Sequence, residues 1–258
     1  MIKQHKGIKI FYEDEGKGPV VLLLHGFLET SAMWKEIKSE IIKTNRVVTV
    51  DLLGHGKTES LSYVHSMDDM ADAVFTVINH LNITKFNAIG HSMGGYVALA
   101  MAEKQPSYFE GLCLMNSSFE ADTDDRKQIR RRAIAMAKVN YKSLITLSFA
   151  NLFAPESTVN FKKAYDDALV IALQTSVQGY IAAQEGMLLR PNRFKTFKTI
   201  KGKKSIIIGK KDTIIDNDLI KFLIEKTDIE MLELAQGHMS HIEDLKNLLT
   251  YLIHYIEK

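Results

Sequence analysis

Short, continuous apolar runs recur along the chain, and they constrain its fold more than any other feature. Five of these runs are rich in Val, Ile and Leu: Val20–Leu24, Arg46–Val50, Phe86–Ile89, Gly111–Met115 and Ser205–Ile208. A sixth run, Ile229–Leu234, alternates more between apolar and polar residues. Continuous runs of this length are typical of parallel strands that helices cover on both faces.

Helical patterns fill most of the intervals between these runs, at Ser31–Lys43, Met67–Leu81, Met93–Lys104 and Ile242–Ile256. Ser66 and Asp69 predict an N-cap and a capping box for the second of these helices. Before the first run, Ile8, Ile10 and Tyr12 alternate with polar residues, which predicts antiparallel edge strands. The order of elements therefore predicts an α/β fold, with a mostly parallel twisted sheet flanked by helices.

The alternation of strands and helices breaks once, between Met115 and Ser205. Helical periodicity continues through this stretch, and no strand signal interrupts it. We therefore expect a core domain made of residues 1–118 and 198–258, with a helical cap, residues 119–197, inserted between late sheet strands.

The composition excludes several classes of protein. The chain has 258 residues, of which 46% are hydrophobic, so it can bury a core and is not disordered. A net charge of +2 lacks the positive excess of a nucleic-acid binder. The single cysteine, Cys113, lies in an apolar run and excludes an internal disulfide or a Cys-cluster metal site. Because no run is long enough for a membrane span and Met1–Lys6 shows no secretory signal, we expect a cytoplasmic protein without a membrane partner.

The sharpest local feature is Gly90-His91-Ser92-Met93-Gly94, which follows a strand run and opens a helical one. This is the strand–turn–helix context of a nucleophile elbow, in which a tight turn lifts the serine hydroxyl off the sheet edge. Such a turn leaves no room for side chains at Gly90 and Gly94, and it strains the serine backbone by ~1–3 kcal/mol. We predict Ser92 as the nucleophile and the Met93 amide, at a helix N-terminus, as an oxyanion donor.

A second turn, His25-Gly26-Phe27, follows the first buried run. One amide from each of two loops is the usual oxyanion arrangement beside such an elbow, so the Phe27 amide is the predicted second donor. We interpret His25 as a structural, hydrogen-bonding residue.

A serine hydroxyl needs a histidine to take its proton, and that histidine needs a carboxylate to orient it. In this class the chain order is serine, acid, histidine. Asp212 follows the strand run at Ser205–Ile208 and is the predicted acid; Asp216 is the alternative, although it also suits a helix cap.

The base should follow the last strand. His238 comes directly after Gly237 in that position and is the predicted base, with His241 as its rival. His91 adjoins the nucleophile, and we interpret it as a packing and hydrogen-bonding residue.

With these motifs in this order, the chain resembles the α/β-hydrolase superfamily, in the small, capped branch that includes esterases, cofactor-free haloperoxidase-like proteins and carbon–carbon bond hydrolases. The resemblance covers nearly the whole length and rests on His25–Phe27, Asp51–Gly56, Gly90–Gly95, Gly209–Asp212 and Gly237–Glu243. It implies that the catalytic histidine follows the last glycine, as His238 does, and that the acid stands at Asp212. The family often has Ser after the second glycine of its G-x-G turn, where this chain has Lys57-Thr58.

Haloalkane dehalogenases and epoxide hydrolases of this fold need Asp at the elbow, so Ser92 argues against both. Gly54–Thr58 is similar to the end of a phosphate-binding loop, but Asp51 stands where that loop needs glycine, which argues against nucleotide binding. Helical zinc pairs usually lie four residues apart, whereas His238 and His241 lie three apart. We therefore predict no metal and no cofactor.

The expected cap carries two further patterns. Arg130, Arg131 and Arg132 fan around a helix, which favours a solvated surface, with Asp122 and Arg126 as an i,i+4 ion pair. Apolar residues suggest either a pocket for an acyl or alcohol group or packing onto the core: Ile129, Met136, Leu144, Leu147, Phe149, Leu152 and Phe153. Tyr165 and Tyr180 could contact substrate or pack in the same way.

Together these features predict a serine hydrolase that cleaves a small carboxylic ester through an acyl-enzyme. Other reactions use related catalytic groups, and the sequence does not separate them from ester hydrolysis: carbon–carbon bond cleavage, lactone opening, thioester hydrolysis, acyl transfer and perhydrolysis. A non-hydrolytic lyase or synthase on the same triad, or a ligand receptor with this fold, is the alternative from another class. The expected partner is a small ester-like substrate.

Overall fold

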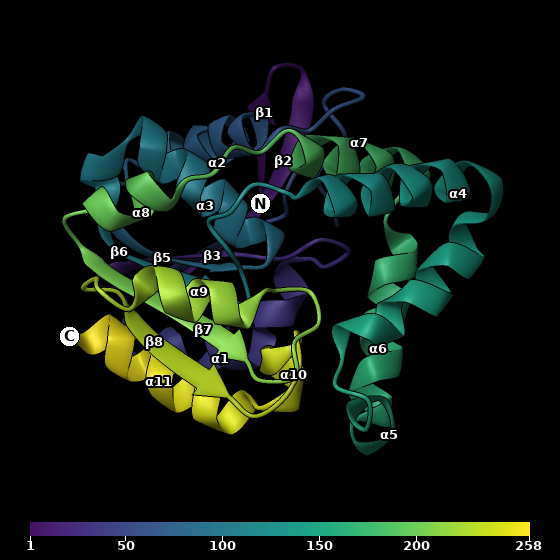
Figure 1. Ribbon diagram of the computed structural model, residues 1–258. Helices are drawn as coiled ribbons and strands as arrows, with labels where there is room; N and C mark the ends of the chain where they lie inside the picture. Colours follow the sequence, from purple (N-terminus) through teal and green to yellow (C-terminus); the bar gives the residue numbers. More distant parts are fainter.

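A computed structural model describes residues 1–258, and its centre is one eight-stranded sheet in the order β1-β2-β4-β3-β5-β6-β7-β8 (Figure 1). The strands are β1 Ile2–His5, β2 Ile8–Gly16, β3 Val20–Leu24, β4 Arg46–Val50, β5 Phe86–His91, β6 Phe109–Met115, β7 Lys203–Gly209 and β8 Glu230–Leu234. Strands β3 to β8 run parallel, whereas β2 pairs antiparallel with both β1 and β4. The mostly parallel sheet with an antiparallel edge is therefore as expected from the apolar runs.

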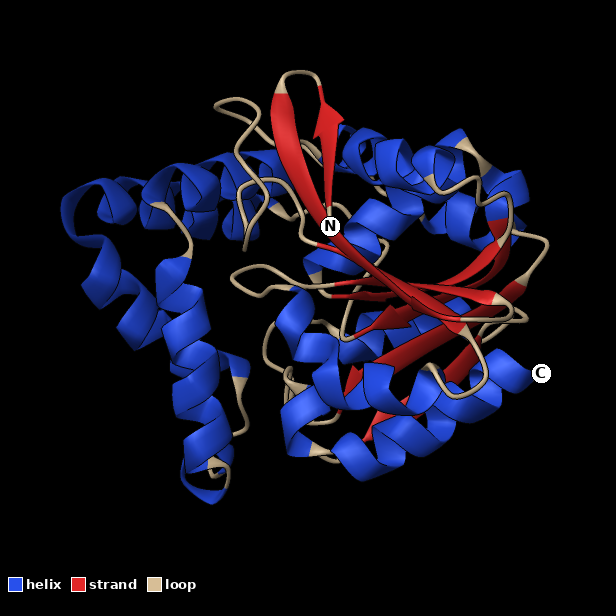
Figure 2. Cartoon of the chain, turned by 180° about the vertical axis from the view of Figure 1, so that it is seen from behind, coloured by secondary structure: helices blue, strands red, loops and turns tan.

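Helices cover both faces of the sheet (Figure 2). On one face, the side chains of α2 Met67–His80, α3 Met93–Lys104, α8 Phe194–Thr199 and α9 Asn217–Ile224 join the main apolar cluster. On the other face, α1 Lys35–Ile41 and α11 Leu245–Glu257 pack around residues such as Trp34 and Tyr255. Cys113 lies buried in this second cluster, where burial raises the pKa of its thiol to about 12. None of the helices combines the length and apolar character needed to cross a membrane.

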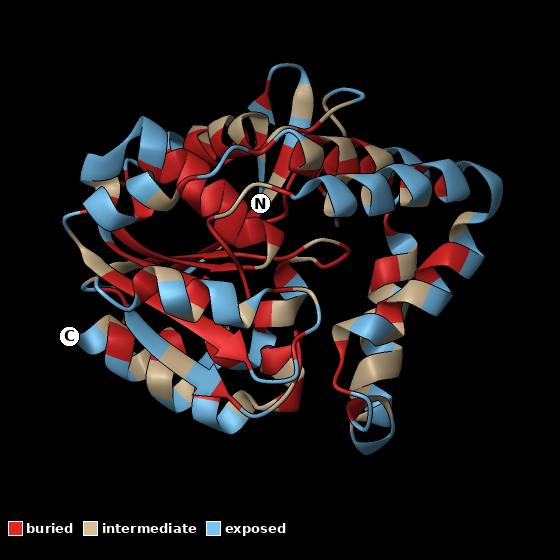
Figure 3. Cartoon of the chain, viewed as in Figure 1, coloured by how far each residue is buried: buried red, intermediate tan, exposed pale blue.

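Between β6 and β7 the chain is helical, as the periodicity predicts. The helices are α4 Asp124–Phe149, α5 Ser157–Asn160, α6 Lys162–Gln174 and α7 Val177–Leu188, before α8 returns to the core. The part of this stretch after α4, residues 157–188, is thus divided into three separate helices. In Figure 1 they extend away from one end of the sheet, and Figure 3 shows that much of their outer surface is exposed.

Helix α4 bends at Asn140, whose φ of −150° and ψ of 79° are not helical. The bend changes which side chains face inward. Leu144, Phe149 and Phe153 pack in a small apolar cluster with Leu28 and Met239 from the core loops. Ile129, Met136 and Leu147 are instead 62%, 54% and 75% exposed, so the single apolar face expected along this segment is wrong at these three positions, although Ile129 lines a cavity.

Asp122 is the buried anchor at the start of the helical segment. The expected pair with Arg126 does not form, because Asp122 precedes α4, whose N-cap is Thr123. Its fully buried carboxylate instead pairs with Arg130 Nε at 2.5 Å and with Arg190 Nη1 at 2.8 Å. Burial raises the pKa of Asp122, but the two guanidinium groups outweigh this and hold the pKa below its usual value.

Asp122→Asn should lower the free energy of unfolding by about 3 kcal/mol, because it leaves two buried guanidinium groups without their counter-charge. Asp124→Asn is the matched control, since Asp124 is 94% exposed and only 3.5 Å from Lys127 Nζ. Urea unfolding of both variants measures the difference. Equal midpoints for Asp122→Asn and the wild type would contradict the assignment of Asp122 as an anchor.

Candidate active site

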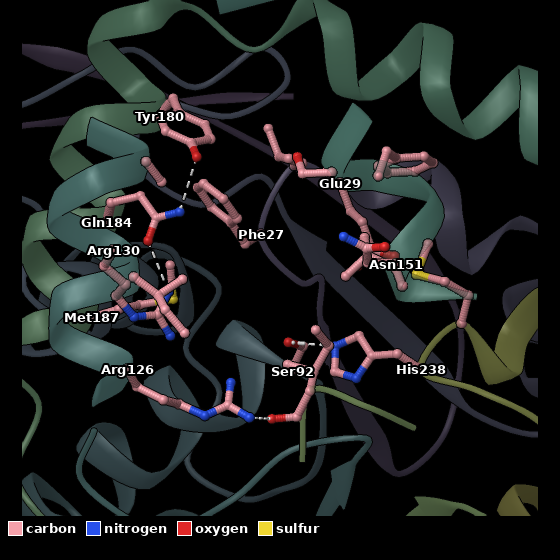
Figure 4. Close-up of a pocket in the computed structure, with 18 of the residues that line it drawn as sticks. Phe27, Glu29, Ser92, Arg126, Arg130, Asn151, Tyr180, Gln184, Met187 and His238 are labelled. Atoms are coloured by element: carbon pink, nitrogen blue, oxygen red, sulfur yellow. Dashed lines mark hydrogen bonds between the residues drawn. The ribbon is translucent and has the colours of Figure 1, made fainter. Parts of the chain in front are cut away.

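Three predicted residues meet at the carboxyl edge of the parallel strands. Ser92 lies between β5 and α3, Asp212 follows β7, and His238 follows β8. His238 Nε2 is 2.9 Å from Ser92 Oγ, and His238 Nδ1 is 2.7 Å from Asp212 Oδ2. The structure therefore brings the predicted nucleophile, base and acid into one hydrogen-bonded chain, part of which is drawn in Figure 4.

The backbone at Ser92 has the strained geometry expected of a nucleophile elbow. Its φ of 48° and ψ of −114° are rarely adopted by residues other than glycine. A Cβ atom at Gly90 would lie 2.5 Å from the Gly94 carbonyl oxygen, and one at Gly94 would collide with the Leu24 carbonyl. The Ser117 hydroxyl donates to the Ser92 carbonyl at 2.7 Å and braces the turn.

Hydrogen bonds hold the Asp212 carboxylate in place. Its Oδ1 accepts from the Ile214 amide at 2.8 Å, and its Oδ2 accepts from Asn116 Nδ2 at 3.3 Å as well as from His238. Burial raises the pKa of Asp212, but His238 and these hydrogen bonds outweigh burial, so the pKa is lowered and the group is ionised. Asn116, at φ 44°, was not singled out in the sequence. Its position directly after β6, at the same sheet edge, is the signal that could have found it.

Asp216 and His241, the alternatives for the acid and the base, do not join this hydrogen-bonded chain. Asp216 caps α9, because its Oδ1 accepts from the Leu219 amide at 3.0 Å. The closest charged partner of His241 is Glu29, with its Nε2 3.7 Å from Glu29 Oε1, and His241 has no hydrogen bond to Ser92.

Two backbone amides beside Ser92 are available as donors. Met93 is the first residue of α3, where amides have no acceptor within the helix, and neither the Met93 nor the Phe27 amide donates a hydrogen bond within the protein. Leu28, next to Phe27, is held at φ 66°, which turns this loop sharply. The two loops thus present unsatisfied N–H groups of the kind that an oxyanion hole requires.

Glu29 forms a buried ion pair that sequence reasoning missed. Its Oε2 accepts from the Gly26 amide and from His91 Nδ1, both at 2.7 Å. On its other side, His91 Nε2 donates to the His238 carbonyl at 3.0 Å. His91 therefore ties the Phe27 loop, the elbow and the His238 loop together.

Both ring nitrogens of His91 act as donors, so its imidazole is positively charged. Burial lowers the pKa of His91, but the Glu29 carboxylate outweighs burial and raises it. Burial likewise raises the pKa of Glu29, but His91 outweighs this and holds it at about 2. The pair is therefore a buried imidazolium and carboxylate.

Glu29, His91 and His241 are the three side chains that lie close enough together to suggest a metal site. Two atoms bound to one metal ion would lie about 3.3 Å apart, given metal–ligand bonds of about 2.0–2.2 Å. The 2.7 Å between His91 Nδ1 and Glu29 Oε2 is shorter and suits a shared proton. These residues do not fit a metal ion as they stand.

His25 has the structural role interpreted from the sequence. Its Nδ1 donates to the Gly26 carbonyl at 2.7 Å, and its Nε2 accepts from the Leu52 amide at 2.9 Å. In the neighbouring turn, Thr58 Oγ1 accepts from the Phe11 amide of β2 at 2.9 Å. Thr58, where this chain departs from the family pattern, thus fastens the turn to β2.

A cavity of about 250 Å³ opens onto Ser92 and His238 (Figure 4). Its wall is apolar along one part, at Leu28, Leu144, Phe149, Leu152 and Met239, and carries Arg126 and Arg130 from α4 along another. Tyr180 also lines the cavity, whereas Tyr165 packs against Phe149 and Phe153. More than half of the lining residues are hydrophobic, and cavities that combine apolar walls with polar groups typically bind small molecules.

Comparisons with known proteins agree with this architecture. A family model described as alpha/beta hydrolase fold matches residues 19–245. Haloalkane dehalogenase 2 of Mycobacterium tuberculosis is 28% identical over 187 residues, which cover 72% of this chain and 64% of that protein. A second Mycobacterium tuberculosis protein, which is uncharacterized, matches over only 33% of its own length. The chain thus spans less than two thirds of these curated relatives.

Solved structures show the same similarity over the full chain. An esterase from Thermogutta terrifontis, with malate bound, has a TM-score of 0.92 at 25% identity and covers 99% of this chain and 96% of its own. An enol-lactonase from Burkholderia xenovorans has a TM-score of 0.92 at 18% identity over 100% of both chains. The predicted fold class is confirmed by these matches.

Glu29→Gln should destabilise the protein by about 3 kcal/mol, because it leaves the buried His91 charge unpaired. The wild-type pair stabilises most between pH 4.5 and 6.5, the usual pKa values of the two groups. In acid, the contribution of Glu29 is lost as the pH falls toward its folded pKa of about 2. In alkali, the contribution of His91 is lost as the pH rises through its raised pKa.

Urea unfolding of both proteins from well below pH 4.5 to well above pH 6.5 measures the difference, which should be largest between these two values and smaller on either side. Glu36→Gln, an exposed acid on α1, is the control and should leave stability unchanged at every pH. A constant difference between Glu29→Gln and the wild type at all pH values would contradict the charged state of the pair.

Proposed function

The chain belongs to the α/β-hydrolase fold family, and from this premise we propose that it is a serine hydrolase that cleaves small carboxylic esters. The observation that carries the proposal is the hydrogen-bonded chain from Ser92 Oγ through His238 to Asp212, with distances of 2.9 and 2.7 Å. Acyl transfer also requires donors that stabilise the negative charge on the carbonyl oxygen, and the unsatisfied amides of Phe27 and Met93 beside Ser92 are such donors.

In the first half of the reaction, His238 Nε2 takes the proton of Ser92 as its oxygen attacks the ester carbonyl. The ionised Asp212 accepts from Nδ1–H, which keeps Nε2 free to accept the proton. The negative charge on the carbonyl oxygen is stabilised by the Phe27 and Met93 amides. His238 then donates the proton to the leaving alcohol, and an acyl-enzyme remains on Ser92.

In the second half, water enters and His238 takes its proton while the water oxygen attacks the acyl carbonyl. The tetrahedral intermediate again places its charge on the two amides. Its collapse returns the proton to Ser92 Oγ and releases the acid. The fixed imidazolium of His91 lies behind these loops and holds them in position through both halves.

The serine nucleophile separates this proposal from dehalogenation, the activity named for the Mycobacterium tuberculosis relative. If Ser92 displaced a halide from carbon, the product would be an ether, which has no carbonyl for water to attack. An ester substrate gives an acyl-enzyme that water can cleave, so the chemistry of Ser92 favours an ester.

The cavity dimensions support a small substrate, and α4 and α7 supply much of its wall. We propose that residues 119–197 act as a lid over the core. The apolar part of the wall, which includes Phe149 and Leu152, would accept a short acyl or alcohol chain.

A fluorophosphonate should add to the wild-type protein once, because the reagent reacts with an activated serine. Intact mass spectrometry measures the adduct. The same treatment of Ser92→Ala should give no adduct, and Ser117→Ala, which lies beside the elbow, should still react. A folded wild-type protein that forms no adduct would refute the serine-hydrolase proposal.

Asp212→Asn should lower kcat for an ester by about 10³-fold or more, because an amide cannot stabilise the imidazolium that His238 becomes. Asp216→Asn is the matched control: asparagine also caps helices well, so this variant should keep wild-type kcat. Steady-state kinetics on a p-nitrophenyl ester measures both. A larger loss in Asp216→Asn than in Asp212→Asn would reverse the assignment of the acid.

A further inference from the structure

The cationic part of the cavity wall points to the substrate class. We propose that the ester cleaved at Ser92 carries a carboxylate, and that Arg126 binds this carboxylate as the residue that determines specificity. The inference rests on the proposed function, because it concerns the substrate of the same site. It assigns to α4 a role that the sequence pattern, interpreted as a solvated arginine surface, did not indicate.

Arg126 is a guanidinium group without a counter-charge. Its Nη2 donates to the backbone carbonyl of Ile214, and its side chain makes no other hydrogen bond and no ion pair within the protein. A guanidinium has five N–H donors, so most of those of Arg126 remain available. The neighbouring acids do not neutralise it: Asp124 is 94% exposed and pairs with Lys127.

The Ile214 contact also places Arg126 close to the reacting groups. The Ile214 amide donates to Asp212 Oδ1 at 2.8 Å, and the Ile214 carbonyl accepts from Arg126. Arg126 therefore lies beside the loop that carries the proposed acid. It lines the same cavity as Ser92 and His238, and Figure 4 shows its side chain extending toward them.

Arg130 adds to the positive charge of this wall. Its Nε pairs with Asp122, and its Nη1 donates to Gln184 Oε1 at 2.8 Å. However, Asp122 also pairs with Arg190, so a single carboxylate serves two guanidinium groups. Two arginines thus share Asp122, Arg126 has no acidic partner, and both Arg126 and Arg130 line the cavity.

No carboxylate that lines the cavity is free to offset this charge. Glu29 is the one acid that lines the cavity, and Figure 4 shows it across the cavity from Arg126. Its charge is already paired with His91. Asp212 lies behind His238 and is held by that residue and by backbone amides. An anionic group on the substrate is therefore the missing counter-charge.

The remaining wall defines the rest of the ligand. Leu144, Phe149 and Leu152 are apolar, so the group that joins the ester to the carboxylate should be a short hydrocarbon chain. A planar guanidinium matches a carboxylate with two parallel N–H donors. Half-esters of short dicarboxylic acids combine these features within a cavity of about 250 Å³.

The kinetic test uses monomethyl esters of succinate, glutarate and adipate. Each is compared with the neutral methyl ester in which an isopropyl group replaces the carboxylate. For at least one chain length, the wild-type kcat/KM should be at least tenfold higher for the acid. Arg126→Gln should lower the ratio of kcat/KM for the acid to kcat/KM for the neutral ester at least tenfold. Arg126→Lys, which keeps the charge but loses the two parallel N–H donors, should lower it less. Arg131→Gln, an exposed arginine of the same helix, is the matched control and should leave the ratio unchanged.

A ratio near one at all three lengths, or a ratio that Arg126→Gln does not change, would overturn the inference. Binding of the same esters to Ser92→Ala, measured by calorimetry, gives a readout that does not need turnover. There, Arg126→Gln should weaken the half-ester at least tenfold relative to the neutral ester, and equal affinities would also overturn the inference. Failure of the hydrolase proposal is distinguishable, because it would appear as a lack of fluorophosphonate labelling in the wild-type protein.

Discussion

The parallel register of β3 to β8 decides where the proposed nucleophile, base and acid of this protein can lie. Because six neighbouring strands point the same way, the loops after β3, β5, β6, β7 and β8 all emerge at one edge of the sheet. Ser92, Asp212 and His238 come from three of these loops and meet within hydrogen-bonding distance, although 146 positions separate the serine from the histidine. The sheet in turn depends on strands whose residues are buried on both faces, such as Val21–Leu24 in β3 and Ile206–Gly209 in β7.

The loops at this edge would have little to hold them without the buried charges behind them. The Glu29 carboxylate accepts from a backbone amide of the Phe27 loop, and its partner His91 donates to the His238 carbonyl. Buried ion pairs contribute little net stability in general, because desolvation offsets their attraction. Here the pair has a geometric effect, since three separate loops must keep fixed positions around Ser92. Asp122 has a similar geometric effect on the helical segment, because its one carboxylate pairs with both Arg130 and Arg190 and holds them in position.

Much of the core was predictable because its signals are local. Each signal can be recognised within a few neighbouring residues, as at Gly90–Gly94 and at Asp212. These signals are a buried strand run, a glycine pair and a polar residue at the end of a strand. The pairing of Glu29 with His91 was not predictable in this way, since 62 positions separate them and neither lies in a pattern that specifies the other. The bend at Asn140 was missed for a related reason. Periodicity assumes one straight helix with one apolar face. The buried residues instead include Ile134 and Ala137 before the bend and Leu144 and Phe149 after it, which leaves Met136 and Leu147 exposed.

Helix α4 contributes both charged and apolar surface to the cavity. Arg126 and Arg130 lie before Asn140, together with the apolar Ile129 and Ala133, and Leu144 and Phe149 lie after it; all of them line the cavity. The proposed nucleophile, base and acid lie on other segments, which the core holds in place. Evolution can therefore alter the charge and shape of the binding surface by substitutions in a single helix while the reactive centre stays intact. This modular arrangement would let one reaction mechanism serve many substrates, with α4 as the part that diversifies.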